Sequence, residues 1–129
     1  MGPVFYVNPN RVPPYSDEHL SVDFDHQMAA LDGKRIVLTR KEYELLALLV
    51  QHAGEIIPRE ALLMQVWGYS SEIRTRTLDV HVRRLRQKLG AHAEEYIETI
   101  FGIGYRFQAF HDVRYFRGPA QRPALALGA

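Results

Sequence analysis

The clearest chemistry in the 129-residue sequence comes from arginines that recur on one side of a predicted helix. Residues 75–89, TRTLDVHVRRLRQKL, form an apolar stripe at 100° per residue, made of Leu78, Val82, Leu85 and Leu89. The opposite side holds Arg76, Val80, Arg83, Arg84 and Gln87. A guanidinium group grips guanine O6 and N7, or a phosphate, through two nitrogens at once. The pattern predicts a helix that buries one face and binds an anionic partner with the other.

A cationic helix face has a second interpretation, in which long charged side chains are simply solvated. Solvated faces usually mix signs, with an acid four residues before a base. Residues 74–88 instead hold six Lys and Arg and a single acid, Asp79. Val80 is also unusual on a solvated surface, whereas it suits contact with a thymine methyl group. Both observations favour nucleic acid as the partner.

Composition limits the other classes of function. The net charge is +1, so the basic character is local, and a near-neutral protein still binds DNA when its charge is concentrated on one face. The absence of Cys excludes disulfides and thiolate metal sites and fits a cytoplasmic location. No apolar run approaches the roughly 20 residues of a membrane span, so no membrane partner is expected. Prolines occupy the start, where a signal peptide needs an apolar segment.

No enzyme, metal site or cofactor site is expected. The six histidines lack H-E-x-x-H or a comparable ligand spacing. The adjacent carboxylates Glu94 and Glu95 fall in a predicted loop, where solvation is the simpler interpretation. Gly102 and Gly104 lack the strand, glycine-rich turn and helix that surround a phosphate-binding loop.

The segment before the helices is predicted to be a supporting sheet. Residues 1–19 are rich in proline and should form a linker or arm, either the remainder of an interdomain linker or a native disordered start. Alternating apolar residues then predict a strand at 20–24, and Asp32-Gly33 predicts a hairpin turn between two further strands. An antiparallel sheet of three or four strands should result.

Two helices should precede the cationic one. Thr39 and Glu42 form a T-x-x-E capping box that starts a helix ending near His52, and its broad apolar surface predicts burial. Residues 55–58 should form a short extended link, and residues 59–67 the second helix. Two helices joined by a loop, the second one cationic, constitute a helix-turn-helix with a lengthened turn.

A C-terminal hairpin completes the predicted domain. Strands are predicted at 96–100 and 105–109 around a tight glycine-containing turn, after a surface connection at 91–95. The expected fold class is α+β: a winged helix-turn-helix with an N-terminal antiparallel sheet, three helices and a C-terminal β-hairpin wing. This domain should span residues 20–110, and residues 111–129 should form a flexible tail.

The order of these elements resembles the winged-helix effector domain of OmpR/PhoB-type response regulators. The segments that show it are LTRKEYELLALL, PREALLMQVWG, RTLDVHVRRLRQKLG and IETIFGIGYRF, within residues 20–107. The arginine-rich run followed by G-x-G-Y-R-F is far more specific than a lone short motif. The resemblance implies a bacterial transcription factor that self-associates head to tail on direct repeats of double-stranded DNA. In the intact regulators, a receiver domain accepts phosphate from a sensor kinase, and RNA polymerase is a further partner.

The resemblance also assigns site residues. The DNA-contacting positions of the third helix, with Gln87 added from its cationic face, are Arg76, Thr77, Val80, His81, Arg83, Arg84, Arg86 and Gln87. Val80 and Arg84 should reach base edges, and the others should mostly hold phosphates. Contacts to the DNA backbone around the second helix are implied at Arg59 and Trp67. Contacts from the wing to phosphate are implied at Thr99 and Tyr105. The segment matching the family's contact with RNA polymerase is Tyr69, Ser70, Ser71, Glu72 and Ile73.

One position departs from the family pattern. Many members have an arginine directly before the G-x-G of the wing, where it enters the minor groove, and this sequence has Phe101. The ring either anchors the turn, which we expect, or wedges against sugars. A different function also remains open, in which the basic face is a protein-interaction module for acidic partners, because a winged helix alone does not fix its use.

Overall fold

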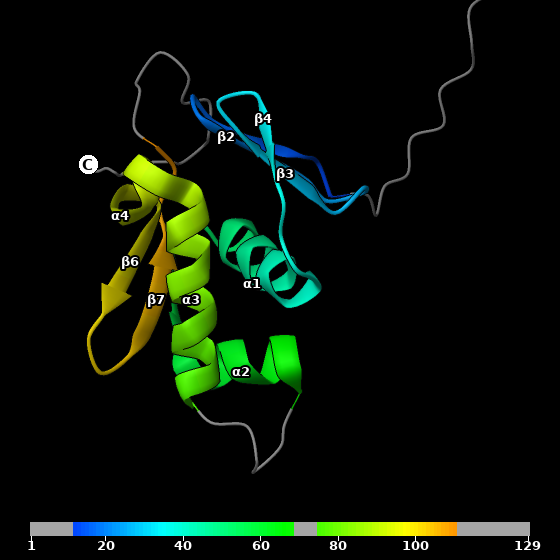
Figure 1. The fold of residues 1–129 in the computed structure, drawn as a ribbon. Helices are drawn as coiled ribbons and strands as arrows, with labels where there is room; N and C mark the ends of the chain where they lie inside the picture. Colours follow the sequence, from blue (N-terminus) through cyan, green and yellow to red (C-terminus); the bar gives the residue numbers. More distant parts are fainter. Residues whose placement is uncertain (1–11, 69–74, 111–129) are drawn as a thin grey trace, which may run out of the picture.

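A four-stranded antiparallel sheet begins the domain in the computed structural model, which describes residues 12–68 and 75–110 (Figure 1). The strands lie in chain order: β1 (Tyr15–Ser16), β2 (Leu20–Asp23), β3 (Met28–Leu31) and β4 (Lys34–Ile36). Asp32 and Gly33 have φ angles of 51° and 81°. Two positive values in a row characterise the tight turn that an Asp-Gly pair forms between antiparallel strands, so the predicted hairpin is confirmed.

The sheet begins earlier than expected. Strand β1 pairs with β2 although it lies inside the stretch assigned to a linker or arm, residues 1–19. Asp17 accepts hydrogen bonds from the Tyr96 hydroxyl at 2.7 Å and from the Leu20 amide at 2.9 Å. These contacts join β1 and the residues after it to the rest of the fold, so the N-terminal sheet includes residues that were assigned to the linker or arm.

Helix α1 (Arg40–Gln51) begins at the predicted capping box. The Glu42 amide donates to Thr39 Oγ1 at 3.2 Å, and the Thr39 amide donates to Glu42 Oε1 at 2.9 Å. The helix ends at its cap residue His52, as predicted. The Glu42 side chain is only 2% exposed, and Lys88 donates to its Oε1 at 2.5 Å. An ion pair therefore ties the start of α1 to the end of the third helix.

The link before helix α2 (Arg59–Trp67) is a strand rather than an unpaired segment. This strand, β5 (Ile56–Pro58), pairs antiparallel with β7 (Gly104–Phe107), which in turn pairs with β6 (Ile97–Ile100). The wing hairpin is confirmed, with shorter strands than predicted, but it belongs to a three-stranded sheet. A Cβ at Gly104 would lie 2.0 Å from the Ile57 carbonyl oxygen, so only glycine lets β7 approach β5 this closely.

Helix α3 (Thr75–Leu89) has the predicted limits. In Figure 1 it lies between the wing strands and helices α1 and α2. Its predicted apolar stripe is at most 1% exposed at each of Leu78, Val82, Leu85 and Leu89. The predicted surface connection after α3 is largely exposed, but it is helical: the chain forms a short 3-10 turn, η1 (Gly90–His92), and helix α4 (Ala93–Tyr96). Within α4, Ala93 and Tyr96 are buried and attach this segment to the core.

The core joins the two sheets to the helices. The rings of Tyr96 and Phe107, both fully buried, stack with centroids 5.5 Å apart at the junction of α4 and β7. Within residues 12–68 and 75–110, no helix combines the length and the apolar character needed to cross a membrane. The tail predicted at 111–129 lies outside the described residues.

Candidate nucleic-acid interface

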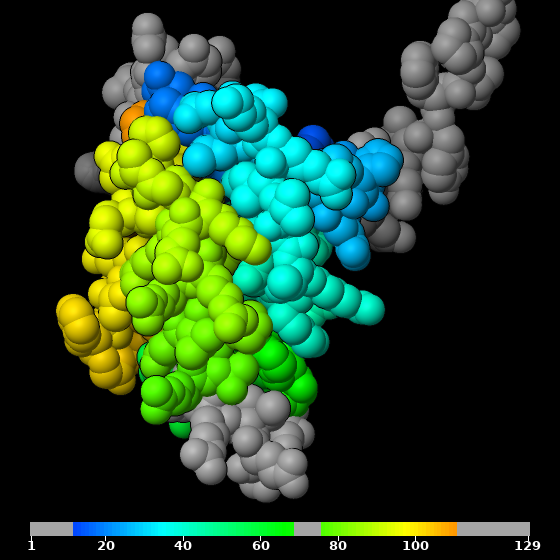
Figure 2. Space-filling view, viewed as in Figure 1, coloured from blue at the N-terminus to red at the C-terminus, as the bar shows by residue number. Residues whose placement is uncertain are grey.

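The outer face of α3 is open to solvent, with the N-terminal sheet and α1 on one side and the wing on the other (Figure 2). Arg76, Arg83, Arg84 and Gln87 are exposed, and Val80 is half-buried among them. None of the residues described in the structure forms an ion pair or a hydrogen bond with the side chains of Arg76, Arg83 and Arg84. The predicted division of α3 into a buried face and a cationic exposed face is confirmed.

Asp79 is the residue around which the neighbouring side chains are arranged. Its Oδ2 accepts a hydrogen bond from Arg59 Nη2 at 2.8 Å, and its Oδ1 accepts one from the Tyr105 hydroxyl at 2.6 Å. These contacts join α3 to the first residue of α2 and to the wing strand β7. In the sequence, Asp79 stands out only as the single acid of a cationic helix. That isolation was the available signal of a specific partner.

The charges of this cluster are stabilised in their ordinary states. The hydrogen bond from Arg59 lowers the pKa of Asp79, and the bond from Tyr105 lowers it further. The same ion pair raises the pKa of Arg59. Burial raises the pKa of Tyr105, and its bond to the Asp79 carboxylate adds to the rise. Asp79 is therefore ionised, and Tyr105 remains protonated and able to donate.

The ring of Tyr105 also lies close to two cations. The guanidinium carbons of Arg59 and Arg86 are 5.9 Å and 5.8 Å from its centroid. Both distances fall within the range in which a cation is attracted to the ring face. Tyr105 is 5% exposed, so these contacts hold two arginines from different helices against the wing.

Arg86 does not lie with the exposed arginines. Its Nη2 donates to the Ile97 carbonyl at 2.8 Å and to Thr99 Oγ1 at 2.7 Å, both in β6. Its buried Nε has no hydrogen-bond partner in the described part of the chain. We expected Arg86 to hold phosphate and Thr99 to do so from the wing. The structure brings these two residues together, so that they join the wing to α3, and their contact with phosphate stays a prediction.

Three further predicted contact residues meet where α2 ends beside α3. His81 Nδ1 lies 2.9 Å from the Thr77 carbonyl oxygen, one helical turn earlier. The rings of His81 and Trp67 pack edge to face with centroids 4.8 Å apart. All three residues are half-buried, so they lie at the edge of the row of exposed arginines rather than in the core.

The tip of the wing is apolar and projects from the fold. Phe101 is 90% exposed and Ile103 is 51% exposed. The expectation that Phe101 anchors the turn is wrong, because a ring this exposed packs against little of its own domain. The residues assigned to RNA polymerase contact, 69–73, lie outside the described residues.

The two sheets, the three longer helices and the arginine row on α3 define a winged helix-turn-helix domain. Residues 33–107 match the family described as "Transcriptional regulatory protein, C terminal", so the chain belongs to that family. The α+β fold class and the resemblance to OmpR/PhoB-type effector domains are thereby confirmed.

Individual relatives agree with this assignment. The transcriptional regulatory protein ResD of Bacillus subtilis (strain 168) is 43% identical over 93 residues, which make up 70% of this chain and 39% of ResD. The response regulator DrrB, an OmpR/PhoB homolog of Thermotoga maritima, superposes with a TM-score of 0.68 at 33% identity, over 74% of this chain and 44% of DrrB. The Klebsiella pneumoniae RstA DNA-binding domain, solved in complex with the RstA box, gives 0.66 at 32% identity, over 74% of this chain and 96% of that domain. The chain thus spans less than half the length of ResD and DrrB.

Proposed function

We propose that α3 enters the major groove of double-stranded DNA and that the domain binds a specific sequence to control transcription. The observation that supports this most directly is the row formed by Arg76, Arg83 and Arg84. These side chains are exposed and have no partner among the described residues, although the opposite face of their helix is fully buried. Guanidinium groups without a partner in the described part of the chain are available to phosphates and guanine edges.

The exposed face divides into base-reading and phosphate-holding positions in this proposal. Arg84 and Val80 lie on its outward side and reach base edges, while Arg76, Arg83 and Gln87 hold phosphates. Thr77, His81 and Trp67 contact the DNA backbone from the edge of this face, beside α2. Contacts to phosphates set the register on the duplex, and contacts to base edges provide the sequence preference.

The residues with partners inside the domain contribute by positioning. Arg86 and Thr99 set the angle of the wing, and Asp79 holds Arg59 and Tyr105 beside the groove-facing surface. The Arg59 side chain is 27% exposed, and in this proposal it also contacts a phosphate of the DNA backbone.

The wider context follows from the family. A regulator of this kind binds direct repeats as a head-to-tail pair, and its receiver domain takes phosphate from a sensor kinase. Residues 69–73 contact RNA polymerase in this proposal, and the protein acts in the bacterial cytoplasm. Neither catalysis nor a cofactor is part of the proposed function.

Selection of bound duplexes from a random pool tests the proposal. Two direct repeats with centres about 10 base pairs apart are expected, because that spacing places two domains on the same side of the helix. A chain with Arg76, Arg83 and Arg84 all replaced by alanine is the matched control, and it should recover no motif. If the native chain fails to bind random duplex even at low salt, DNA binding is refuted in favour of a protein-interaction module.

A further inference from the structure

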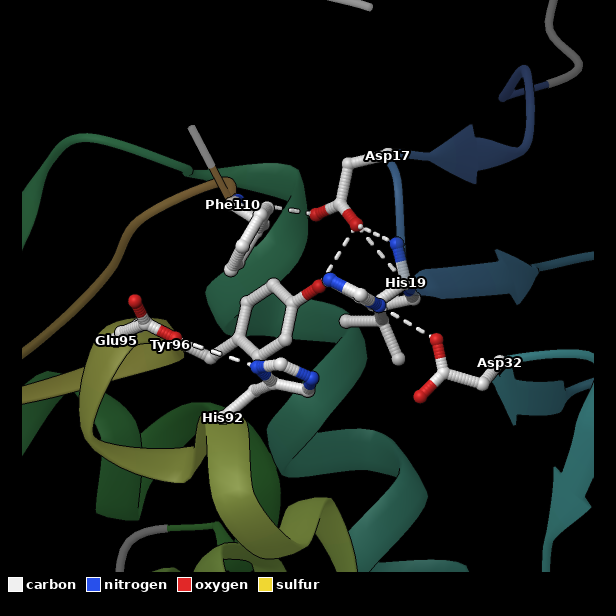
Figure 3. Close-up of polar contacts among 8 residues, drawn as sticks. Asp17, His19, Asp32, His92, Glu95, Tyr96 and Phe110 are labelled. Carbon is white, nitrogen blue, oxygen red and sulfur yellow. Dashed lines mark hydrogen bonds and ion pairs between the residues drawn. The ribbon is translucent and has the colours of Figure 1, made fainter. Parts of the chain in front are cut away.

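Two histidines and an aspartate from three separate parts of the chain meet at the end of the domain opposite the wing tip (Figures 1 and 3). His19 precedes β2, Asp32 lies in the β3–β4 turn, and His92 ends η1. One ligand atom from each lies within 4.8 Å of the other two. These residues are far apart along the chain and form no local motif, so no metal site was expected from the sequence.

The cluster is held by contacts around it. The Asp32 amide donates to the His19 carbonyl at 2.7 Å, which fixes the turn against the histidine that it faces. The two imidazole rings stack with centroids 4.0 Å apart, and the Phe110 ring packs edge-on against His19 at 4.4 Å. The side chains of His19 and His92 are 20% and 24% exposed, so both have limited freedom yet remain reachable from solvent.

Each imidazole has a carboxylate at its Nδ1. His19 Nδ1 lies 2.5 Å from Asp32 Oδ1, and His92 Nδ1 lies 3.3 Å from Glu95 Oε1. A histidine that binds a metal usually donates its other ring nitrogen to such a carboxylate, which orients the ring and increases its basicity. Glu95 is therefore placed to orient His92 and to leave Nε2 for an ion.

We propose that His19, Asp32 and His92 form a binding site for a divalent transition-metal ion of the Zn²⁺ type. Two imidazole nitrogens and one carboxylate oxygen are ligands that Zn²⁺ accepts, with water in the remaining position. Ligand atoms around tetrahedral Zn²⁺ are roughly 3.4 Å apart, given bonds of about 2.0–2.1 Å. To reach this spacing, the His19 Nδ1–Asp32 Oδ1 pair opens from 2.5 Å as the ion replaces the proton between them, and the other ligand atoms, which lie within 4.8 Å of one another, move closer. These shifts are on the order of 1 Å.

The consequence is a metal-dependent link between the N-terminal sheet and the segment that follows α3. An ion that binds only the folded chain raises its thermal midpoint by mass action. At free Zn²⁺ about 100 times the Kd, the expected rise in Tm is on the order of 10 °C for a domain of this size.

The test is a calorimetric Zn²⁺ titration and a thermal melt of the 129-residue chain, each repeated after EDTA. His19→Gln, Asp32→Asn and His92→Gln should each abolish the Tm rise, while their melts in EDTA show that they fold. Glu95→Gln should weaken Zn²⁺ about tenfold, because its carboxylate orients a ligand without binding the ion. The visible spectrum of bound Co²⁺ should show imidazole ligation in the native chain and change in both histidine variants.

His26 supplies a matched control. Its Nδ1 lies 2.6 Å from Asp23 Oδ2 in an exposed pair, and it is absent from the cluster of ligands. The His26→Gln chain should retain the full Zn²⁺ response. No Zn²⁺-dependent rise in the native chain, or an equal rise in the His19 and His92 variants, overturns the proposal.

Discussion

The hydroxyl of Tyr105 in the wing donates to the carboxylate of Asp79 in α3 at 2.6 Å. The same carboxylate accepts a bond from Arg59 at 2.8 Å, so one acid joins α2, α3 and the wing. This acid is also the only one in the arginine-rich helix, where it would otherwise oppose an anionic partner. Asp79 therefore serves to position Arg59 and Tyr105. Substitutions at Asp79 should alter the geometry of the interface and the dependence of the domain's stability on pH.

Low pH should remove the contribution of the Asp79 ion pair to the stability of the domain. Its folded pKa is lowered, so its stabilising contribution is complete above the ordinary carboxyl pKa and is lost as pH falls through the lower folded value. Between about pH 5 and 2, the free energy of unfolding of Asp79→Asn should therefore fall less than that of the native chain. The difference should be less than about 1 kcal/mol, because Asp79 is 47% exposed.

Urea unfolding across that pH range measures this difference. Glu94→Gln, which removes an exposed acid from α4, is the control and should leave the profile close to that of the native chain. Parallel profiles for the native chain and Asp79→Asn would show that the pair contributes nothing.

Removing Arg84 should reduce sequence preference without harming the fold. Arg84→Ala should cost about 1–3 kcal/mol of binding to the selected site and less on random duplex. Its free energy of unfolding should change by no more than about 0.5 kcal/mol, since the side chain is exposed.

The measurement is a competition titration over a range of salt. About six phosphate contacts predict a native log–log slope of roughly −5, which Arg84→Ala should leave nearly unchanged if it reads a base. Arg40, 85% exposed on α1, supplies the control, and Arg40→Ala should bind as the native chain does. Equal losses of affinity for the selected site and for random duplex would show that Arg84 contacts the DNA backbone rather than a base.

Arg86 should behave differently from Arg84, although the two are only two positions apart on α3. Arg86→Ala removes the bonds to Ile97 and Thr99 and leaves a carbonyl without its partner. It should lower the free energy of unfolding by about 1–3 kcal/mol and weaken binding to all duplexes alike, because the wing is no longer fixed. Urea unfolding and filter binding on the same samples check both effects, with Arg83→Ala, exposed on α3, as the control for stability alone. Unchanged stability in Arg86→Ala would show that its contacts to β6 are dispensable.

The elements specified by local pattern were predictable from the sequence. The apolar stripe of α3, the capping box at Thr39 and the Asp32-Gly33 turn each depend on residues within a few positions of one another. Physical preferences over such short spans do not need the rest of the chain, which is why their limits agree with the structure.

The missed features depend on distant partners. Strand β5 has three residues and becomes a strand only because it pairs with β7, nearly fifty positions later. The partners of Asp79 are 20 and 26 positions away, and those of Asp17 include Tyr96 at 79. Helix α4 is four residues long, below the length at which periodicity is visible. In the candidate site, therefore, the exposed row on α3 was predictable and the network behind it was not.

Phe101 gives the most direct check of the wing. Its side chain is 90% exposed, so Phe101→Ala should change the free energy of unfolding by no more than about 0.5 kcal/mol. Phe107, six residues later and fully buried, is the matched control, and Phe107→Ala should cost about 3–5 kcal/mol. Urea unfolding of the two variants separates a projecting ring from a packed one. A large loss in Phe101→Ala would mean that the ring packs against its own domain after all.

A ring that does not pack against its own domain is free to contact the sugars of the minor groove. Phe101→Ala should therefore bind duplex DNA more weakly while remaining as stable as the native chain.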